Sequence, residues 1–278
     1  MTPNRSILIT GCSSGIGHAV ALGLHNKGYR VFASARRRAD VLRLQQQGLE
    51  SVQLDLDDSQ SVKQAVDRVL TETGGELYAL FNNGAFGQPG AVEDLSRQVL
   101  KETFETNLFG WLELTNLVIP VMRRQGYGRI IQNSSVLGFV AMPYRGAYNA
   151  SKFALEGLTD TLRLELHGSG ICVSLIEPGP ISSTFRSNAL AKFNANIDGE
   201  RSFHREQYAV MLQRLNKPGP AAPFTLPAEA VMKPVLHCLE HKRPRARYPV
   251  TVPTHLFTYL KRILPTRILD RILRRAGA

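Results

Sequence analysis

The sequence has only three cysteines, Cys12, Cys172 and Cys238, and no two of them are close together. An odd number of cysteines without a C-x-x-C pair points to neither a disulfide framework nor a zinc site, so we expect no metal centre. Hydrophobic residues make up 43% of the 278 positions, which is enough to bury a core without such staples. A folded protein of a reducing compartment fits this composition.

Long hydrophobic runs are also absent. No stretch approaches the roughly 18 consecutive apolar residues that a membrane-spanning helix needs. The first residues, MTPNRSILITG, lead directly into a strand-like segment and do not resemble a signal peptide. We therefore expect a cytoplasmic protein.

Acidic residues are scarce in one part of the chain. The formal net charge is +11, from 34 Lys and Arg against 23 Asp and Glu. Residues 1–240 carry 24 basic and 22 acidic residues, whereas residues 241–278 carry ten basic residues and only Asp270. A nucleic-acid-binding protein is expected to carry a basic stripe across its folded body, so we expect no nucleic-acid partner.

Short apolar runs alternate with longer amphipathic stretches along the chain. Runs rich in Val, Ile and Leu predict strands at Ser6–Thr10, Arg30–Ala35, Ser51–Leu56, Leu77–Asn82, Arg129–Ser134, Ile171–Glu177 and Ala246–Val250. Apolar residues at helical spacing predict helices at Gly15–Lys27, Ser59–Thr73, Lys101–Gln125 and Tyr148–His167.

This alternation predicts an α/β protein with a Rossmann-type, doubly wound parallel sheet, because near-continuous apolar strands have both faces covered by helices. We expect one catalytic domain over residues 1–252. Its segment 182–227 is irregular and rich in proline, which is typical of a lid over a binding site. Residues 253–278 form a basic, amphipathic helical extension.

A glycine-rich turn follows the first predicted strand. Gly11, Gly15 and Gly17 stand in Thr10-Gly-Cys-Ser-Ser-Gly-Ile-Gly17, directly before a predicted helix. Such glycines permit a tight turn, a close approach of the backbone to a pyrophosphate, and close packing of helix on strand. The alternative is a turn that binds no ligand, but its position in a βαβ pattern favours dinucleotide binding.

The G-x-x-x-G-x-G spacing resembles the short-chain dehydrogenase/reductase family, and four further segments match in order. They are Asn83 in Asn-Asn-Gly-Ala, Asn107 in Thr-Asn-Leu-Phe-Gly, Ser135 in Asn-Ser-Ser, and Tyr148-x-x-x-Lys152, followed by Pro178-Gly179-Pro180-Ile181 after the sixth strand. The resemblance covers about residues 5–185. It is closest to NADP-dependent aldehyde reductases and to enzymes of the retinol and 17-beta-hydroxysteroid dehydrogenase type.

The Tyr148 and Lys152 pair has a chemistry that can be argued independently. Residues four apart lie on one face of a helix, so the lysine ammonium can lower the pKa of a phenol that ordinarily lies near about 10. The resemblance implies that Tyr148 transfers the proton, Ser135 positions the substrate oxygen, Lys152 also holds the nicotinamide ribose, and Asn107 supports a proton-relay water. Ser134 is the competing serine, and an incidental surface pair is the competing interpretation of Tyr148 and Lys152.

The end of the second strand indicates the cofactor. Enzymes that prefer NAD usually carry an acid there, whereas an arginine accommodates the 2′-phosphate of NADP. This chain has Ala35-Arg36-Arg37-Arg38 and no carboxylate, so we expect NADP(H), with Arg36 and the Ser13 hydroxyl as phosphate ligands. A solvated basic turn is the alternative.

The resemblance implies further cofactor contacts, at Ser14, Ile16, Asp55, Leu56, Asn83, Gly84, Pro178, Gly179 and Ile181, beside the three loop glycines, Tyr148 and Lys152. One departure is that the usual Asn-Ala-Gly of the family is here Asn83-Gly84-Ala85. Any left-handed backbone conformation in this segment would therefore fall on Gly84.

Large apolar side chains recur in the predicted lid, and they either line a lipophilic site or anchor the lid to the core. They are Phe185, Phe193, Phe203, Tyr208, Met211 and Phe224, and Val140, Met142 and Tyr144 are further candidates for the pocket wall. We expect a small lipophilic carbonyl or alcohol substrate resembling a retinoid, a steroid or a fatty aldehyde.

The basic extension carries leucines and isoleucines at helical spacing, and Pro265 divides it into two predicted helices. Such a segment can lie on an anionic membrane or pack on the protein. We expect its first half to pack and its last turn to lie at the surface. The family resemblance also implies a homo-oligomer formed through the helices at Lys101–Gln125 and Tyr148–His167.

These features together predict an NADP(H)-dependent oxidoreductase that interconverts a carbonyl and an alcohol, acting mainly as a reductase of lipophilic aldehydes or ketones. Two alternatives remain open. One is a dehydrogenase that oxidises steroid- or retinol-like alcohols, and the other is a non-catalytic NADP(H)-binding sensor or scaffold.

Overall fold

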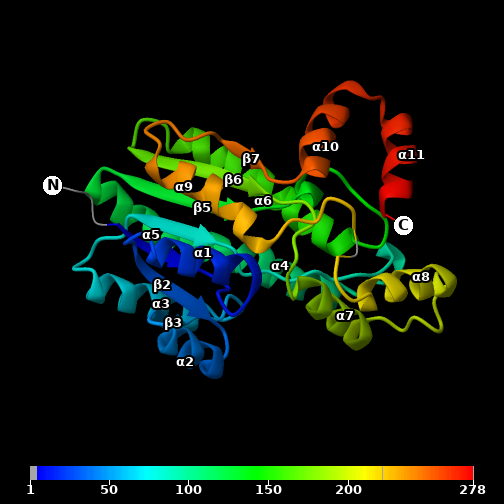
Figure 1. Ribbon diagram of the computed structural model, residues 1–278, viewed down its shortest axis with the longest axis horizontal. Helices are drawn as coiled ribbons and strands as arrows, with labels where there is room; N and C mark the ends of the chain where they lie inside the picture. The colour runs from blue at the N-terminus through cyan, green and yellow to red at the C-terminus, as the bar shows by residue number, and fades with distance from the viewer. Residues whose placement is uncertain (1–4, 221, 278) are drawn as a thin grey trace.

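A seven-stranded parallel sheet forms the centre of the computed structural model, which describes residues 5–220 and 222–277 (Figure 1). The strand order is β3-β2-β1-β4-β5-β6-β7, so the order reverses between β1 and β4. The strands are β1 (Ser6–Ile9), β2 (Arg30–Ala35), β3 (Glu50–Gln53), β4 (Ala79–Asn82), β5 (Gly128–Asn133), β6 (Ile171–Glu177) and β7 (Arg247–Pro249). The predicted doubly wound fold is confirmed.

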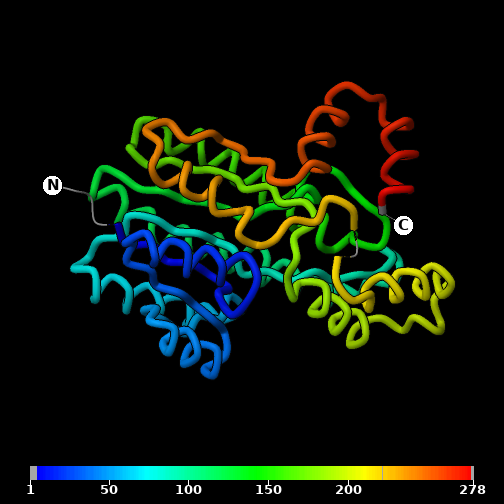
Figure 2. Tube along the Cα trace, viewed as in Figure 1, coloured from blue at the N-terminus to red at the C-terminus, as the bar shows by residue number. Residues whose placement is uncertain are grey.

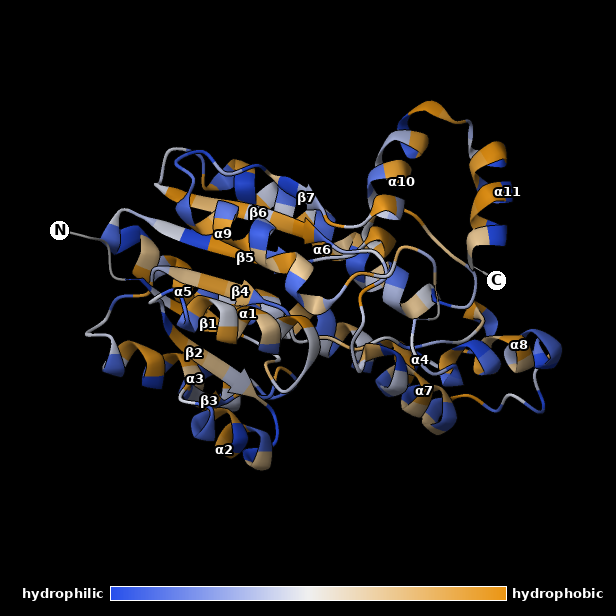
Figure 3. Cartoon of the chain, in the orientation of Figure 1, coloured by the Kyte–Doolittle hydropathy of each residue, from blue (hydrophilic) through white to orange (hydrophobic). Residues whose placement is uncertain are grey.

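Helices cover both faces of the sheet, and each face has its own apolar core. On one face lie α1 (Gly15–His25), α2 (Arg38–Gln46) and α9 (Met232–Glu240), packed through residues such as Val20, Leu44 and Val235. On the other lie α3 (Ser59–Glu72), α5 (Gly110–Gln125) and α6 (Gly146–Glu165), packed around the buried Trp111. Figure 3 shows hydrophobic colouring along β2, β4 and β6, which lie between these layers.

The long helix predicted at Lys101–Gln125 is interrupted. The chain forms α4 (Arg97–Phe104), a wider π-helical turn η2 (Glu105–Phe109) and then α5. The apolar spacing continues through all three, so the sequence pattern does not show the break. The wider turn contains Asn107, and π-turns of this kind occur frequently at functional sites.

The predicted lid contains two helices, α7 (Phe185–Asn196) and α8 (Arg205–Asn216), which the weak periodicity of the segment did not predict. Both lie beyond the carboxyl ends of the strands, and the chain then returns through η4 (Ala228–Val231) to α9 (Figure 2). Ile181 and Leu226 form an isolated bridge where the segment leaves and rejoins the sheet. Two further short helices are η1 (Val92–Asp94), after β4, and η3 (Val136–Gly138), after β5.

The basic extension forms α10 (Val252–Ile263) and α11 (Thr266–Gly277), and the predicted division at Pro265 is confirmed. Phe257 and Leu273 are buried against Val136 and Val140, in the segment that follows β5. Leu273 completes this apolar cluster, whereas the residues that follow it in the last turn, Arg274, Arg275 and Ala276, are exposed, as the sequence predicts. Within the described ranges, no helix is long and apolar enough to span a membrane.

Candidate active site

The candidate site lies at the carboxyl ends of β1 and β4, where the strand order reverses. Chains following adjacent strands diverge there to opposite faces of the sheet, which opens a crevice for a nucleotide. The glycine turn follows β1, Asn83 follows β4, and Ser135 follows β5. The topology thus brings together residues that are far apart in the sequence.

The turn between β1 and α1 has no room for side chains. Gly11 and Gly15 have positive φ angles of 70° and 58°, which favour glycine. A Cβ atom on Gly17 would lie 2.3 Å from the carbonyl oxygen of Gly11, and one on Gly11 would lie 2.6 Å from the Cα of Gly84. Close contact of backbone with backbone therefore explains Gly11, Gly17 and Gly84, and Gly84 has no positive φ.

The N-terminus of α1 fits a dinucleotide phosphate. Its N-cap residue, Ser14, makes no hydrogen bond from its side chain to the helix, and the first turn holds no acidic residue. The main-chain N–H groups and the helix dipole at this end favour an anion. Ser14 instead hydrogen-bonds through its hydroxyl to Thr184 of the lid at 2.6 Å, and Ser13 and Ile16 lie partly exposed in the same turn.

The Asn83 side chain hydrogen-bonds to residues at the ends of neighbouring strands. Its Nδ2 donates to the carbonyl oxygens of Thr10 at 3.0 Å and Gly11 at 3.2 Å, and its Oδ1 accepts from Asn133 at 2.8 Å. These contacts connect the ends of β1, β4 and β5. The structure therefore places the Asn83 side chain beneath the nucleotide turn, where it supports the shape of the turn.

The remaining predicted cofactor contacts lie around the crevice. Asp55 and Leu56 follow β3, and the Asp55 carboxylate accepts from the main-chain N–H of Asp57 at 3.2 Å. Pro178 follows β6, and its carbonyl accepts from Val136 at 2.8 Å. Gly179 and Ile181 continue this segment; a Cβ on Gly179 would lie 2.1 Å from the hydroxyl oxygen of Thr251.

Arginines cluster near the end of β2, and two of them are placed to meet a phosphate. Arg36 is exposed at the strand tip, as the sequence predicts, and its carbonyl accepts from Gln53 at 3.0 Å. Arg43, on α2, was not predicted: its Nη2 donates to the carbonyl of Ser13 at 2.6 Å and pairs with Asp40 at 2.9 Å. The only sequence signal for Arg43 is its place one turn into a helix that the periodicity did not reveal.

Tyr148 and Ser135 meet across the crevice. Tyr148 lies in the first turn of α6 and faces the Ser135 hydroxyl, whose interaction with the phenol oxygen acts to lower the tyrosine pKa. The Ser135 hydroxyl accepts from the N–H of Leu137 at 3.1 Å. The Ser134 hydroxyl lies instead near Gly138 and Glu156: a Cβ on Gly138 would be 2.5 Å from this hydroxyl and 3.1 Å from Glu156. The structure thus pairs Tyr148 with Ser135, the serine that the family spacing favours.

Lys152 lies one turn further along α6 and is buried. Its Nζ donates to the carbonyl of Asn133 at 2.8 Å and lies 4.1 Å from the ring centroid of Trp111 and 5.8 Å from that of Tyr148. Since Asn133 also binds Asn83, hydrogen bonds run from Lys152 to the nucleotide turn. The pair is therefore not an incidental surface feature.

Asn107 is fully buried, and its side chain is occupied. The amide donates to the carbonyl of Phe86 at 2.9 Å and accepts from the N–H of the same residue at 3.0 Å, with a further contact to Ser151 at 3.3 Å. It thereby fixes the segment after β4 against the π-helical turn. Because its side chain is occupied, Asn107 could contribute to a proton relay only through its main chain or by holding the segment after β4 in place.

The pKa values of the pair differ from the sequence expectation. Burial raises the pKa of Tyr148 to about 12, although the Ser135 hydrogen bond opposes the rise, so the expectation of a lowered tyrosine pKa is wrong here. Burial also lowers the pKa of Lys152 to about 7, with the Glu156 carboxylate acting in the opposite direction. Desolvation disfavours both charged forms, and for the phenol it outweighs the opposing effect of the Ser135 hydroxyl.

A carboxylate network that no sequence pattern predicted lies next to Lys152 on α6. Arg247 of β7 contacts Glu156 at 2.9 Å, Asp160 at 2.7 Å and Glu177 at 3.1 Å. Burial raises the pKa of Glu177 to about 8, and neighbouring Glu156 adds to the rise while Arg247 opposes it. The network ties β6 and β7 to the helix that carries Tyr148 and Lys152.

A cavity of about 370 Å³ opens at Tyr148, between the sheet and the lid. Phe185, whose ring lies 5.4 Å from that of Tyr148, Met211 and Tyr144 belong to its wall. The other candidates for this wall do not line it: Phe193 and Tyr208 anchor the lid in a buried cluster, Phe203 and Phe224 are exposed, and Val140 and Met142 pack with the C-terminal helices.

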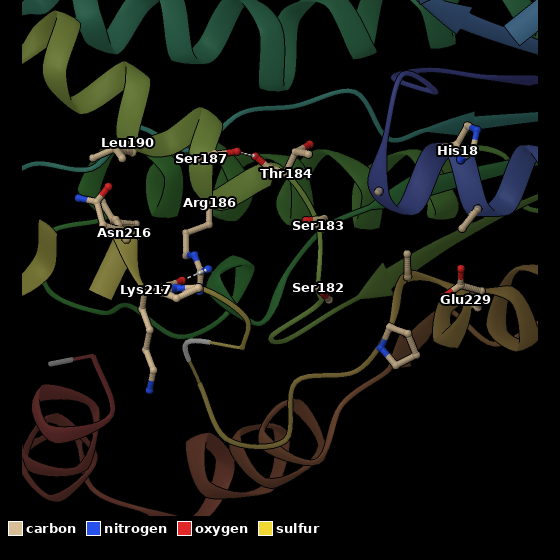
Figure 4. A pocket seen from close by; sticks show the side chains of 16 residues that line it. His18, Ser182, Ser183, Thr184, Arg186, Ser187, Leu190, Asn216, Lys217 and Glu229 are labelled. Carbon is tan, nitrogen blue, oxygen red and sulfur yellow. Dashed lines mark hydrogen bonds between the residues drawn. The ribbon is translucent and has the colours of Figure 1, made fainter. Parts of the chain in front are cut away.

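A second, more open cleft of about 700 Å³ joins the nucleotide turn to the lid (Figure 4). Gly15 and His18 of α1 form one side of it, and Ser183 and Arg186 belong to the lid side. Ser182 and Ser183 also line the first cavity, so the same lid segment borders both spaces. A nucleotide held at α1 would therefore have its path to Tyr148 covered by the lid.

Comparison with known proteins agrees with this arrangement. Residues 5–194 match the model of the short chain dehydrogenase family. The chain is 44% identical to the uncharacterized oxidoreductase YbbO of Escherichia coli over 97% of its own length and 94% of that protein. It is 37% identical to human retinol dehydrogenase 8 over 68% of its length and 62% of that protein.

A solved short-chain dehydrogenase/reductase from Burkholderia phymatum, in complex with NAD, superposes with a TM-score of 0.78 at 25% identity, covering 98% of this chain and 96% of the other. The family fold binds a nicotinamide cofactor, and the glycine turn and open helix N-terminus described above fit that group. The chain belongs to the short-chain dehydrogenase/reductase family and is an oxidoreductase of that family acting on CH–OH donors.

Proposed function

We propose that this protein is an NADPH-dependent reductase of lipophilic aldehydes or ketones. The observation that carries the proposal is the Tyr148 phenol, which faces Ser135 and lines a cavity with apolar side chains in its wall. A carbonyl oxygen in this cavity would accept hydrogen bonds from both hydroxyls, and such donors stabilise the negative charge that develops on the oxygen. When bound at the nucleotide turn, NADPH would supply the hydride that the carbonyl carbon accepts.

The protonation of Tyr148 favours the reductive direction. Because burial raises its pKa to about 12, the phenol holds its proton at neutral pH and can donate it to the alkoxide oxygen as that oxygen forms. Lys152, fixed by Asn133, lies where its ammonium stabilises the phenolate that remains. By family resemblance Lys152 also holds the nicotinamide ribose, and Asn107 positions the relay that returns a proton to Tyr148.

A preference for NADPH is supported by the charges at the end of β2. Arg36 is exposed there, Arg43 lies against Ser13, and the Asp40 carboxylate in the first turn of α2 is paired with Arg43. Guanidinium groups bind phosphate through paired N–H donors, whereas an NAD-preferring site needs an acid for the ribose hydroxyl. We therefore assign the 2′-phosphate to Arg36 and the Ser13 hydroxyl, with Arg43 as a second cation.

The proposal is tested by following the absorbance of NADPH with purified protein and a panel of medium-chain aldehydes, retinal and ketosteroids. We expect turnover of at least one lipophilic carbonyl, with NADPH used better than NADH. Tight NADPH binding without turnover of any carbonyl or alcohol would overturn it in favour of the non-catalytic sensor. Faster alcohol oxidation than reduction near neutral pH would favour the dehydrogenase.

Attachment to an anionic membrane is a second proposal, supported by the outer surface of the C-terminal helices. Leu256 is 51% exposed, Tyr259 63% and Ile263 75%, beside the cations Lys261 and Arg262. The turn between α10 and α11 is hydrophobic (Figure 3). Apolar side chains flanked by cations bind bilayers that contain anionic lipids.

Cosedimentation with phosphatidylglycerol vesicles tests this proposal. The double substitution Leu256→Ser and Ile263→Ser should weaken binding, because both side chains are exposed and neither supports the fold. Val210→Ser, at a 58% exposed position on α8, is the matched control and should bind as the unchanged protein does. Equal sedimentation of all three proteins, or no preference over phosphatidylcholine, would contradict it.

Self-association remains a prediction. Several apolar side chains on the helices expected to form the contact are exposed, among them Phe109, Leu112, Phe153 and Leu158. Their burial in a second copy would remove these apolar groups from water. Sedimentation velocity of the full chain tests it, and a monomer at all concentrations would contradict it.

A further inference from the structure

Three arginines line the cavity into which Tyr148 opens. Arg145 directly precedes α6, three residues before Tyr148; Arg186 is in the first turn of α7; and Arg214 is in the last turn of α8. They come from three separate parts of the chain, and the lid brings two of them to the substrate side of the site. None of them was a candidate site residue in the sequence.

No acidic side chain lines this cavity in the part of the chain that the structure describes. Within the same residues, neither Arg186 nor Arg214 forms a salt bridge, and the Arg214 guanidinium donates no hydrogen bond to the protein. Arg186 donates only to main-chain carbonyls, those of Lys217 and of Gly219, the latter at 2.9 Å. The described acceptors of Arg186 are thus neutral.

The arginines also act on one another unfavourably. Burial lowers the pKa of Arg145 to about 9, and the like charge of Arg214 lowers it further. The pKa of Arg214 is lowered for the same reasons, by burial and by Arg186. Holding like charges together in a partly desolvated cavity is costly, and perturbed groups of this kind gather at functional sites. An anion placed among them would relieve the repulsion and accept charge-assisted hydrogen bonds.

The rest of the cavity wall is suited to an apolar chain. Leu137, Ile181, Phe185 and Met211 contribute apolar side chains to it. The cavity volume of about 370 Å³ lies at the lower end of the range for small-molecule sites. It thus combines a proton donor, apolar walls and a cationic group.

We propose that the substrate is an amphipathic carbonyl compound that carries an acid group, a carboxylate or a phosphate, bound by Arg145, Arg186 and Arg214 while its carbonyl lies at Tyr148. This inference rests on the proposed reductase activity and specifies its substrate class. The acid group orients the chain, so that only a carbonyl at a suitable distance from the anion reaches the phenol.

The test compares substrates that differ only in charge. NADPH consumption is measured with a series of medium-chain ω-oxo fatty acids, their methyl esters, and the corresponding ω-phosphate aldehydes. We expect kcat/KM for either the carboxylate or the phosphate compound to exceed that of the methyl ester of the same chain length by about ten- to a hundred-fold, as for a charge-assisted hydrogen bond. The better acid identifies the anion.

Arg214→Gln should remove most of this preference through a rise in KM for the acid, while kcat/KM for the methyl ester falls much less. Arg205→Gln, at an exposed position on the same helix, is the matched control and should behave as the unchanged protein. Arg214→Gln should also keep or raise the Tm, because it removes like-charge repulsion, whereas an arginine with a purely structural role would lower the Tm when replaced. Arg186→Gln provides a second variant, at the part of the cavity wall that α7 contributes.

Equal kcat/KM for acid and ester, or an equal loss of both in Arg214→Gln with an unchanged Tm, would overturn the anion proposal while the reductase activity stands. Absence of turnover with every substrate would instead contradict the proposed function itself. The two failures are therefore distinguishable.

Discussion

The nucleotide end and the substrate end of the active site are built on different principles. At the nucleotide end, glycines bring backbone against backbone, and a single Cβ on Gly17 would collide with the carbonyl of Gly11. At the substrate end, side chains such as Phe185, Arg145 and Arg214 from separate segments shape a cavity under a lid. The first end is specified by local backbone geometry and the second by which segments the lid brings together.

The largest expected effect lies where the two ends meet, at the proton donor. Tyr148→Phe should lower kcat/KM for reduction by about 10²- to 10⁴-fold, because it removes the hydroxyl and leaves the ring. NADPH affinity, measured by fluorescence titration, should stay within a few-fold, since the nucleotide turn is untouched. Full activity in this variant would mean that another group donates the proton.

A pH profile separates the two directions of the reaction. The pKa of Tyr148 is raised to about 12, so below that value the phenol predominates and the phenolate increases with pH. Alcohol oxidation requires the phenolate as base, so its kcat/KM should rise with pH by about tenfold per unit in the alkaline range. Carbonyl reduction uses the phenol and should show no such rise.

Parallel profiles for oxidation and reduction between pH 7 and 9 would show that Tyr148 does not control the proton transfer.

The variant Glu156→Gln tests the contribution of the Lys152 charge to the same pH profile. Because the Glu156 carboxylate raises the pKa of Lys152 against the effect of burial, its removal should lower that pKa below about 7. Any limb of the profile that depends on the lysine charge should then move to lower pH.

Glycine substitutions test whether the nucleotide end depends on backbone contact. Gly17→Ala should destabilise the protein by about 1–3 kcal/mol and weaken NADPH binding, because the new methyl has no space. Gly157→Ala is the matched control within α6, where a Cβ meets no atom within 4 Å, and it should raise stability by about 0.5–1 kcal/mol. Thermal unfolding measures both, and equal Tm values would contradict the contact.

The smallest expected effect concerns cofactor choice. Arg36→Ala should raise the KM for NADPH by about tenfold, as for one lost charge-assisted hydrogen bond, and leave the KM for NADH nearly unchanged. Arg37→Ala, the neighbouring exposed arginine, serves as the control. Equal weakening of NADPH and NADH would mean that Arg36 does not contact the 2′-phosphate.

Much of the nucleotide end could be predicted because its signals are local. The glycine turn between β1 and α1, the residues at the strand ends and the Tyr148–Lys152 spacing are each readable within a few positions. The topology of the sheet follows from strand and helix alternation. Arg43 escaped prediction because its helix is short and largely polar, so its apolar periodicity is weak.

The substrate end could not be predicted in the same way. Most of the lid aromatics suited either a pocket or an anchor, and the structure buries Phe193 and Tyr208 in a cluster that anchors the lid instead of in the cavity wall. Val140 and Met142 lie close in sequence to Ser135 but pack against α10 and α11. Proximity to Ser135 along the chain therefore does not predict which side chains line the cavity, because segments distant in the sequence pack against these residues.

The amino-acid sequence by itself determined the doubly wound sheet, the glycine turn and the place of Tyr148 and Lys152, since each depends on short-range periodicity or on steric limits within one turn. Only the tertiary structure decided that Ser135, not Ser134, meets Tyr148, that burial raises the pKa of that tyrosine, and that three distant arginines share its cavity. Burial and long-range proximity are properties of the packed chain, and no local pattern encodes them.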